Sequence, residues 1–439
     1  MKYHIWTEGC QMNVADSMRV ASSLEKLGYH TTEKPAEADV IILNTCVVRQ
    51  SAEDKAIGRL SSLKPLKTKN PELVINLMGC MVGVKDNPKL KTRFPFVDVF
   101  SPPSDPVPLI HHLLEKEGRI HELDETLARF AYMDGDLVIP DTDQGNLISS
   151  FVPVVLGCSH ACTYCIIPYR RGIEKSRPPH EILGEAQALI HQGVKEITLL
   201  GQIVDRYGAD QPDYPTLAGI LRRLHSIDGL ERIRFLTSHP NYMTDELLDV
   251  VAEYPKVMPH IEVPIQAGND QVLENMRRGY TNQQYRDLIE KIKNRIPGVS
   301  IATDIIVGFP GETEQQFQDT VDLLADLKLD VAHLARYSPR EGTVSARRME
   351  DDVPDEEKWR RFRLLEELQE GIATGIHATY QNQSVPVLFE EKSKKGRWRG
   401  RTETNKLVFA ESEQDLHGQL LNVTIDWTGP WSMLGHLIP

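Results

Sequence analysis

The stretch FVPVVLGCSHACTYC, residues 151–165, joins an apolar run to three closely spaced cysteines. Val152–Gly157 is short, apolar and rich in valine, which is typical of a buried strand in a parallel sheet. The run ends in a C-x3-C-x2-C loop at Cys158, Cys162 and Cys165. We therefore expect three thiols at the C-terminal end of a strand, where α/β proteins place their ligands.

Strand-like and helix-like segments alternate downstream of this loop. Six β/α units in succession predict a partial (β/α)6 barrel, with an open doubly wound sheet as the competing topology. A long helix is expected over Asp355–His377, and we assign residues 150–375 to this domain. The five further strand-like runs are Glu196–Gly201, Arg232–Thr237, His260–Ile265, Ser300–Val307 and Val331–Tyr337.

The N-terminal part has the same alternation on a smaller scale. Three runs rich in valine and isoleucine are separated by segments with helical spacing, which predicts a βαβαβ order and a small open α/β domain over residues 1–125. The expected strands are Lys2–Thr7, Asp39–Thr45 and Leu73–Gly79, and the expected helices are Ala15–Gly28 and Ser51–Leu63.

The tail changes character after Gln383. Short strand-like runs separated by turn residues are the pattern of a small all-β barrel, to which we assign residues 378–439. The runs are Val385–Phe389, Arg397–Arg401, Leu407–Ala410, Leu421–Trp427 and Met433–Ile438.

Composition narrows the class of protein. The 439 residues carry a net charge of −13, and 40% of them are hydrophobic, which is typical of a globular chain of two or three domains. No apolar run approaches the ~20 residues that span a bilayer, and the N-terminus lacks the apolar core of a secretory signal. We expect a cytoplasmic protein that makes no contact with a membrane.

Three cysteines in the N-terminal part occupy equivalent places. Cys10, Cys46 and Cys80 each follow one of the three expected strands within a few residues. Because parallel strands end at the same edge of a sheet, these three thiols are expected to meet there. The alternative is three unrelated buried cysteines, since free cysteine is often buried.

The three cysteines of the C-x3-C-x2-C loop allow two kinds of metal site. Three thiolates from Cys158, Cys162 and Cys165 hold a 4Fe-4S cluster with one iron left open, because such a cluster takes four ligands. Structural zinc is the alternative, with His160 as a fourth ligand. That histidine lies between two of the cysteines and would have to bend back sharply, which favours the cluster.

The C-x3-C-x2-C loop resembles the signature of the radical S-adenosylmethionine enzymes, and the whole chain is similar to their methylthiotransferase family. Of its branches, one acts on isopentenyladenosine at position 37 of tRNA, another on threonylcarbamoyladenosine in tRNA and another on a ribosomal-protein aspartate. Gln11-Met12-Asn13 and Val47-Val48-Arg49 resemble the first branch most, while Glu8 stands where tyrosine is expected. The similarity rests on TEGCQMN, LNTCVVR, CTYCIIPYRRG, LLGQ, TSHP, IVGFPGET, YSPREGT and GRTETNK.

The resemblance implies two 4Fe-4S clusters, S-adenosylmethionine and a division of labour. The cluster on Cys158, Cys162 and Cys165 would bind S-adenosylmethionine and form the radical that takes hydrogen from carbon 2 of the adenine. The cluster on the other three cysteines would carry the sulfur and deliver it as a methylthio group. We expect a monomer that acts on the tRNA anticodon stem-loop and takes electrons from a flavodoxin or ferredoxin. An iron-sulfur electron carrier or RNA-binding protein without catalysis is the alternative from another class.

Polar residues after the other barrel strands are candidates for binding the cofactor or the substrate. They lie at the face where barrel enzymes hold their active sites, although each is as well suited to cap a helix or turn. Gly308 would let the backbone approach a ligand closely, and Tyr164 would stack on the cofactor adenine or serve in packing. The polar candidates are Gln202, Ser238, Gln266 and Asp304.

The tail also carries a concentrated positive charge. Between residues 392 and 406 there are seven basic residues and one acidic residue, Glu403. Together with an interleaved tryptophan they predict an RNA surface, and the segment is similar to the TRAM domain. A solvated charged hairpin is the alternative. The expected RNA-binding residues are Lys394, Lys395, Arg397, Trp398, Arg399, Arg401 and Lys406, and Arg170, Arg171, Arg277 and Arg278 would extend the surface.

Overall fold

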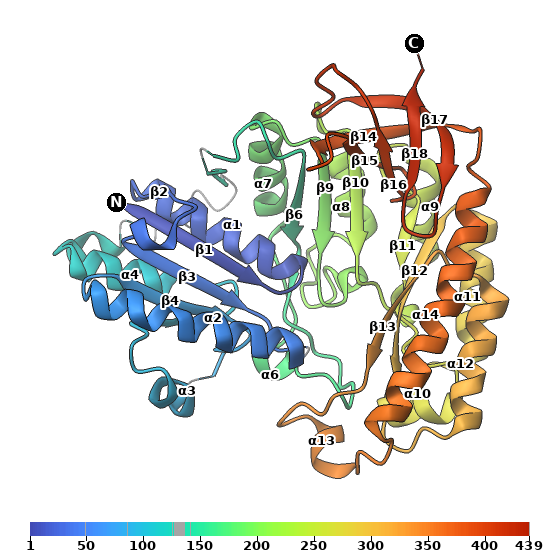
Figure 1. Ribbon diagram of the computed structural model, residues 1–439, viewed down its shortest axis with the longest axis horizontal. Helices are drawn as coiled ribbons and strands as arrows, with labels where there is room; N and C mark the ends of the chain where they lie inside the picture. Colours follow the sequence, from blue (N-terminus) through green and yellow to red (C-terminus); the bar gives the residue numbers. More distant parts are fainter. Residues whose placement is uncertain (49, 86, 125, 127–136, 141, 439) are drawn as a thin grey trace. The chain divides into compact units, whose positions relative to one another are not determined.

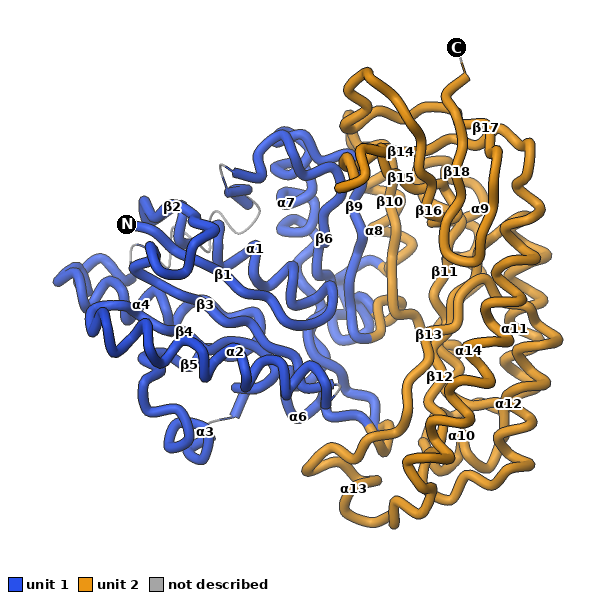
Figure 2. The backbone as a smooth tube through the Cα atoms, in the orientation of Figure 1, with its two compact units in different colours: residues 1–161, 165–202, 207–215 blue, residues 162–164, 203–206, 216–439 orange. Residues whose placement is uncertain are grey.

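The computed structural model describes residues 1–439 apart from 49, 86, 125, 127–136, 141 and 439 (Figure 1). The chain divides into two compact units (Figure 2). Unit 1 comprises residues 1–161, 165–202 and 207–215, and unit 2 comprises residues 162–164, 203–206 and 216–439. The domain extents expected from the sequence remain predictions, and the expected boundary at residue 125 lies outside the described residues.

Unit 1 begins with a parallel sheet of five strands in the order β2-β1-β3-β4-β5. The two central strands β3 and β4 are buried at every residue, because helices cover both faces of the sheet. The sheet has two strands more than expected, β2 and β5, which are too short to show a pattern in the sequence. Its elements are β1 Lys2–Glu8, α1 Gln11–Lys26, β2 His30–Thr31, η1 Pro35–Glu37, β3 Val40–Thr45, α2 Gln50–Lys69, β4 Val74–Gly79, α3 Pro88–Arg93, β5 Val99–Ser101, α4 Val107–Lys116 and η2 Ile120–Glu122.

The rest of unit 1 starts the series of β/α units. Strand β6 pairs in parallel with β9, as expected. The single strand expected over Val152–Gly157 is instead two strands, because Val155 leaves the sheet to pair with Ser176 in an antiparallel ladder. The elements are β6 Ser149–Pro153, β7 Val155–Leu156, α6 Ile167–Arg171, β8 Lys175–Ser176, α7 Pro179–His191 and β9 Glu196–Leu200.

Unit 2 continues the alternation of strands and helices. Strands β11, β12 and β13 are parallel and adjacent in that order. Together with β6, β9 and β10 they make six strands that alternate with helices along the described part of the chain, as a partial (β/α)6 barrel requires. The long helix α14 lies close to its expected range. The elements are η3 Val204–Arg206, α8 Leu217–His225, β10 Arg232–Leu236, η4 Pro240–Tyr242, α9 Asp245–Glu253, β11 His260–Glu262, α10 Asp270–Met276, α11 Asn282–Arg295, β12 Ser300–Val307, α12 Glu314–Leu327, β13 Val331–Arg336, α13 Val344–Arg348 and α14 Asp355–Ala378.

The tail forms a closed barrel of five strands in the order β14-β15-β16-β18-β17. Alternate side chains of each strand enter a core that includes Val387, Phe389 and Val408. The small all-β barrel expected from the sequence is confirmed. Its strands are β14 Ser384–Lys392, β15 Trp398–Thr402, β16 Leu407–Ala410, β17 Leu420–Thr428 and β18 Met433–Leu437.

Within the described ranges, no helix is both long and apolar enough to cross a lipid bilayer.

Candidate active site

The structure brings Cys10, Cys46 and Cys80 together at one edge of the N-terminal sheet. Thr45 of β3 lies opposite Gly79 of β4 in the parallel register, so the next residues, Cys46 and Cys80, leave neighbouring strands at the same level. Cys46 and Cys80 are buried, whereas Cys10 is exposed. Cys46 and Cys10 both act electrostatically on the Cys80 thiol, so both lie near it.

Two buried asparagines connect the loops that carry these cysteines. The side-chain oxygen of Asn13 accepts a hydrogen bond from the Cys10 backbone N–H, at 3.3 Å. The Asn13 amide donates to the side-chain oxygen of Asn44 at 3.0 Å and to the Thr45 carbonyl at 3.1 Å. The Thr45 carbonyl also accepts from the Cys80 backbone N–H at 2.8 Å. Asn13, in the Gln-Met-Asn string, therefore links the loops of all three cysteines. In the Val-Val-Arg string, Arg49 lies outside the described residues.

Gly79 must be a glycine because of the same arrangement. Its φ of +97° is a conformation that other residues adopt with strain, and a Cβ there would lie 2.5 Å from the Asn44 side-chain oxygen. The close approach of the two loops therefore depends on the missing side chain at Gly79.

A buried arginine lies beside this set of thiols. Burial raises the pKa of Cys80 to about 11, while the guanidinium of Arg171 opposes the rise through its charge and a hydrogen bond. Arg171 donates to Asp16 at 2.9 Å, and both side chains are almost completely buried. The residue was expected on an RNA surface, but its burial excludes that position.

The second cysteine loop begins at a tight backbone contact in unit 1. Gly157 has a φ of +67°, and a Cβ there would lie 2.1 Å from the Ile173 carbonyl oxygen. The Cys158 backbone N–H donates to the Gly172 carbonyl at 3.0 Å. The Cys158 sulfur accepts a hydrogen bond from the backbone N–H of His160 at 3.4 Å. These contacts fix the start of the loop.

Cys162 belongs to unit 2 and is held by a second buried arginine. Arg278 Nη1 lies 3.3 Å from the Cys162 sulfur, while its Nε donates to the Tyr280 hydroxyl at 2.8 Å. The next residue, Thr163, donates its backbone N–H to the Met276 carbonyl and its hydroxyl to the Asn275 carbonyl. Arg278, also expected on the RNA surface, is buried instead, and its guanidinium lies beside the Cys162 sulfur.

The spacing of these side chains bears on the choice between zinc and an iron-sulfur cluster. In the part of the chain that the structure describes, no three His, Cys, Asp or Glu side chains are close enough to hold one metal ion. The three thiolates of a 4Fe-4S cluster bind three different iron atoms, so they lie farther apart than the ligands of one zinc ion. A zinc site with His160 is therefore not observed among the described residues, and a cluster at each cysteine set stays the prediction.

Within unit 1 the segment after Cys165 packs against the loop that carries Cys80. Ile166 belongs to the same buried apolar cluster as Cys80 and Val47. Gly83 also lies close to Arg170, because a Cβ on Gly83 would meet that side chain at 3.3 Å. Within unit 1, the segment that follows Cys165 is thus joined to the Cys80 loop by direct packing.

The polar residues expected at the barrel strand ends form a connected group in unit 2. The backbone N–H of Ser238 donates to the Glu262 carbonyl, and that of Gln266 donates to the Asp304 carbonyl at 2.8 Å. Gln266 and Thr237 both have positive φ, at 82° and 67°. Strained residues of this kind cluster at functional sites. Gln202 belongs to unit 1, where it is half-buried just after β9.

Glu262 was missed by sequence reasoning, although it lies in this group. Its carboxylate accepts from the Thr237 backbone N–H at 2.9 Å and lies 3.8 Å from the His333 ring. Burial and the nearby Asp304 carboxylate raise the pKa of Glu262 to about 7. The connected group of strand-end residues therefore includes one carboxyl, that of Glu262, whose pKa lies near neutral pH.

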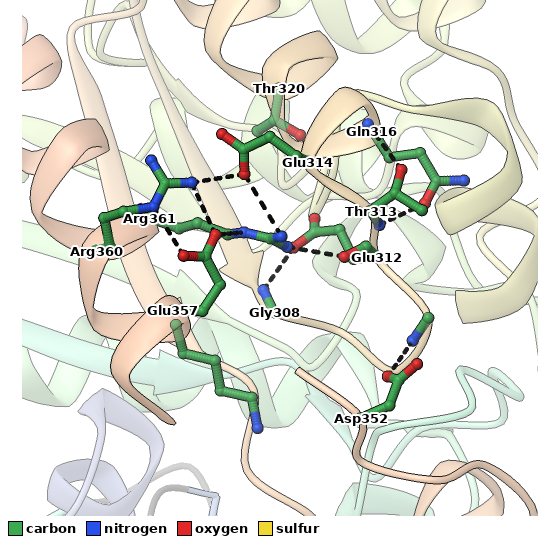
Figure 3. Close-up of polar contacts among 12 residues, drawn as sticks. Gly308, Glu312, Thr313, Glu314, Gln316, Thr320, Asp352, Glu357, Arg360 and Arg361 are labelled. Carbon is green, nitrogen blue, oxygen red and sulfur yellow. Dashed lines mark hydrogen bonds and ion pairs between the residues drawn. The ribbon is translucent and has the colours of Figure 1, made fainter. Parts of the chain in front are cut away.

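Gly308 is engaged by the protein itself (Figure 3). Its backbone N–H donates to the buried carboxylate of Glu312 at 2.6 Å, and Arg361 pairs with the same carboxylate at 2.8 Å. A Cβ on Gly308 would lie 2.3 Å from the Lys358 side chain. The close approach observed at this glycine is to Lys358, and the place of Gly308 among the cofactor-binding candidates stays a prediction.

Tyr164 takes part in an aromatic chain of unit 2. Its ring meets Phe309 edge-on, with centroids 6.4 Å apart, and Phe309 meets Tyr337 in the same way at 5.4 Å. The packing role considered from the sequence is therefore observed.

Two of the expected RNA-binding residues are buried inside unit 2. Trp398 lies in the core of the small barrel, and Lys406 pairs with Asp330 and contacts Ser300. Alternation along β15 puts Trp398 inside and Arg399 and Arg401 on the outer face, because successive side chains point to opposite faces. Trp398 and Lys406 are therefore removed from the expected surface.

The remaining basic residues stay on the surface, with acidic neighbours that the local sequence does not include. Arg397 pairs with Glu411 at 2.9 Å, and Arg399 pairs with Glu391 at 2.8 Å. Exposed pairs of this kind contribute about 0–1 kcal/mol each, so phosphate can replace the carboxylates. Lys394 and Lys395 lie exposed in the β14–β15 turn, while Arg401 is half-buried on β15.

Comparison with known families agrees with the three parts of the fold. Residues 152–324 match the Radical SAM superfamily, residues 2–101 match the family described as Uncharacterized protein family UPF0004, and residues 378–438 match the TRAM domain. The matches define a radical S-adenosylmethionine protein with an additional N-terminal domain and a C-terminal TRAM barrel.

Proteins named as tRNA-modifying synthases match nearly the whole length of this chain. A tRNA-2-methylthio-N(6)-dimethylallyladenosine synthase of Roseiflexus sp. (strain RS-1) is 47% identical and covers 99% of this chain and 89% of its own. The synthase of Dehalococcoides mccartyi (strain CBDB1) is 45% identical and covers 99% and 98%. The chain belongs to the family of tRNA-2-methylthio-N(6)-dimethylallyladenosine synthases.

Solved structures resemble the fold at much lower identity. The radical S-adenosylmethionine methyltransferase TsrM from Kitasatospora setae, solved with cobalamin and a [4Fe-4S] cluster, has a TM-score of 0.55 at 13% identity and covers 79% of this chain and 74% of its own. The cobalamin-dependent enzyme OxsB has a TM-score of 0.53 at 11% identity and covers 87% and 68%. These likenesses concern the fold alone.

Proposed function

We propose that this protein attaches a methylthio group to carbon 2 of N6-isopentenyladenosine, also called dimethylallyladenosine, at position 37 of tRNA. The observation that carries the proposal is the pair of cysteine sets in a chain 45–47% identical to synthases of that name over nearly its whole length. The relatives favour this branch over threonylcarbamoyladenosine or a ribosomal-protein aspartate.

Each cysteine set has one proposed cofactor. Cys158, Cys162 and Cys165 hold the 4Fe-4S cluster that binds S-adenosylmethionine, and the N-terminal set holds a second 4Fe-4S cluster. When bound, these groups supply the radical chemistry and the transferred sulfur. The protein positions them: the Asn13 and Asn44 contacts fix the N-terminal loops, and Arg278 contacts Cys162.

The strand ends of the barrel are proposed to bind S-adenosylmethionine and the target adenosine. Gln202 lies after β9, whereas Ser238, Gln266 and Asp304 form the connected group in unit 2. The Ser238 hydroxyl is buried and has no hydrogen-bond partner among the described residues, so it is available to a ligand. Tyr164, within the Cys158–Cys165 loop, packs on Phe309 and is a further candidate for contact with the cofactor adenine.

The TRAM barrel is proposed to bind the anticodon stem-loop of the tRNA. The phosphate contacts come from the basic side chains of the β14–β15 hairpin: Lys394, Lys395, Arg397, Arg399 and Arg401. Because Trp398 is buried, base stacking would fall to Trp427 and Trp431, which are 50% and 59% exposed.

Three further features belong to the proposal. We infer that the protein acts in the cytoplasm, where its tRNA substrate is found, and that it acts as a monomer. A flavodoxin or ferredoxin supplies the electrons, since cleavage of S-adenosylmethionine in this chemistry requires a one-electron donor.

Mass spectrometry of tRNA nucleosides tests the proposed function. In a strain that lacks this gene, we expect 2-methylthio-isopentenyladenosine to disappear and isopentenyladenosine to accumulate, and the intact gene should restore the modification. A variant with Cys158, Cys162 and Cys165 changed to alanine should not restore it. Loss of the methylthio group from threonylcarbamoyladenosine instead would contradict the choice of substrate.

A further inference from the structure

Arg171 is a positive charge built into the interior of unit 1. Its side chain is 3% exposed and donates to Asp16, which is fully buried, and to the Ser104 hydroxyl at 3.4 Å. Such a charge is costly to bury, so it persists only where it is paired or meets another negative group.

The partners of Arg171 are themselves held in place. Ser104 donates its hydroxyl to Asp16, so Asp16, Ser104 and Arg171 form a closed triangle of hydrogen bonds. Ser104 has a φ of +60°, a left-handed conformation that is strained for serine. Strain of this kind is kept where the surrounding structure requires it, which is commonly at functional sites.

The triangle does not use the whole guanidinium. The Nε of Arg171 is buried and has no hydrogen-bond partner among the described residues. The neighbouring Arg170 lies against Gly83 of the Cys80 loop, since a Cβ on Gly83 would be 3.6 Å from the Arg170 Cα, and the charge of Arg171 acts on the thiols of Cys80 and Cys10. Arg171 thus lies near the N-terminal cysteine set while its ion pair with Asp16 holds it in place.

We propose that Arg171 is a positioning residue that fixes a positive charge beside the N-terminal cysteine set and thereby raises the reduction potential of the cluster held there. The inference rests on the proposed function, since it takes Cys10, Cys46 and Cys80 as the ligands of a 4Fe-4S cluster. Reduction adds one electron to a site that already carries three thiolates. A nearby cation in a medium of low dielectric constant stabilises that added negative charge.

The same charge acts on sulfur bound at the open iron. Hydrosulfide and thiolate sulfur are anionic, and the unpartnered Nε is a donor suited to them. Arg171 would therefore favour retention of anionic sulfur at this site until it is transferred.

A redox titration of the N-terminal cluster tests the inference. The full-length chain with Cys158, Cys162 and Cys165 changed to alanine carries this cluster alone, and dithionite supplies the electron while electron paramagnetic resonance follows reduction. Arg171→Gln should lower the midpoint potential by a tenfold or greater change in the one-electron equilibrium constant, which is 59 mV or more. Arg171→Lys should restore most of the difference.

A second variant keeps Arg171 and should shift the midpoint potential in the opposite direction. Asp16→Asn leaves the charge of Arg171 uncompensated, so the midpoint potential should rise. Arg19→Gln on the same helix is the control, because Arg19 pairs with Glu185 and should leave the potential unchanged. If Arg171→Gln fails to fold, the double variant with Asp16→Asn removes both charges together and should lower the potential.

The inference is overturned if clusters loaded with about four irons per chain keep the same potential in the Arg171→Gln and Asp16→Asn variants. A chain that binds no iron at Cys10, Cys46 and Cys80 would contradict the proposed function instead. The two failures are therefore separable by iron content.

Discussion

Arg171, the last residue of helix α6, donates to the buried carboxylate of Asp16 on helix α1 at 2.9 Å, and its charge opposes the rise in the pKa of the nearby Cys80 thiol. Helix α6 begins two residues after Cys165, so one short segment runs from the second cysteine set to the first. Five helical residues rise only about 7.5 Å. Within unit 1 this segment packs against the loop that carries Cys80.

Loss of Asn13 should loosen the N-terminal cysteine loops. Asn13→Ala removes the hydrogen bonds to Asn44 and Thr45 and leaves buried groups unpaired, at a cost of about 1–3 kcal/mol in the free energy of unfolding. Iron bound by the chain after anaerobic reconstitution should fall toward the content of one cluster. Asn76→Ala is the matched control, since Asn76 is equally buried and bonds Ser101. Equal iron loss in both variants would show that the effect is not specific.

The basic hairpin should determine the salt dependence of tRNA binding. Changing Arg397, Arg399 and Arg401 together to glutamine removes phosphate contacts, so the slope of log affinity against log salt should become shallower by about 2–3. Filter binding at several salt concentrations measures it, and cleavage of S-adenosylmethionine should be unchanged. An unaltered slope would remove these arginines from the RNA interface.

Lys406 should behave differently from its basic neighbours. Lys406→Met leaves the Asp330 carboxylate without its ion pair in a partly buried place, which should destabilise the protein by about 3–5 kcal/mol. Urea denaturation measures the loss. The salt slope of tRNA binding should remain that of the unaltered protein, and a shallower slope would return Lys406 to the RNA surface.

Glu262 should make stability depend on pH. Its pKa rises from 4.5 in the unfolded chain to about 7 in the fold, so the folded state binds the extra proton between these values. The free energy of unfolding therefore falls as pH rises through this range, by about 3 kcal/mol in total. Glu262→Gln keeps an acceptor for Thr237 and has no such charge to bury.

Denaturation of the cofactor-free protein at two pH values checks this sign. Glu262→Gln should be more stable than the unaltered protein at about pH 8 and nearly equal to it at about pH 5. A difference that grows toward low pH would contradict the assignment.

Much of the fold could be predicted because its strands are unusually regular. Val40–Thr45 and Val74–Gly79 are continuous apolar runs, which is the pattern of central parallel strands. Their parallel direction then brings Cys46 and Cys80 to the same edge. Strands β2 and β5 have two and three residues, too few to show a period, so they were missed.

The buried charges could not be predicted, because their partners are distant in the sequence. Arg171 and Arg278 both stand in Arg-Arg-Gly strings that look like surface charge. Asp16 lies 155 positions from Arg171, and Cys162 lies 116 positions from Arg278. Trp398 is a different case, because the two-residue alternation of a strand already puts it on the face opposite Arg399 and Arg401.

Iron and acid-labile sulfide per chain after anaerobic reconstitution test the central claim most directly. Two sets of three cysteines should hold two 4Fe-4S clusters, so the unaltered protein should contain about eight irons. Changing either Cys10, Cys46 and Cys80 or Cys158, Cys162 and Cys165 to alanine should leave about four. An unaltered chain with about four irons, all lost when one set is replaced and none when the other is, would contradict the assignment of a cluster to each set.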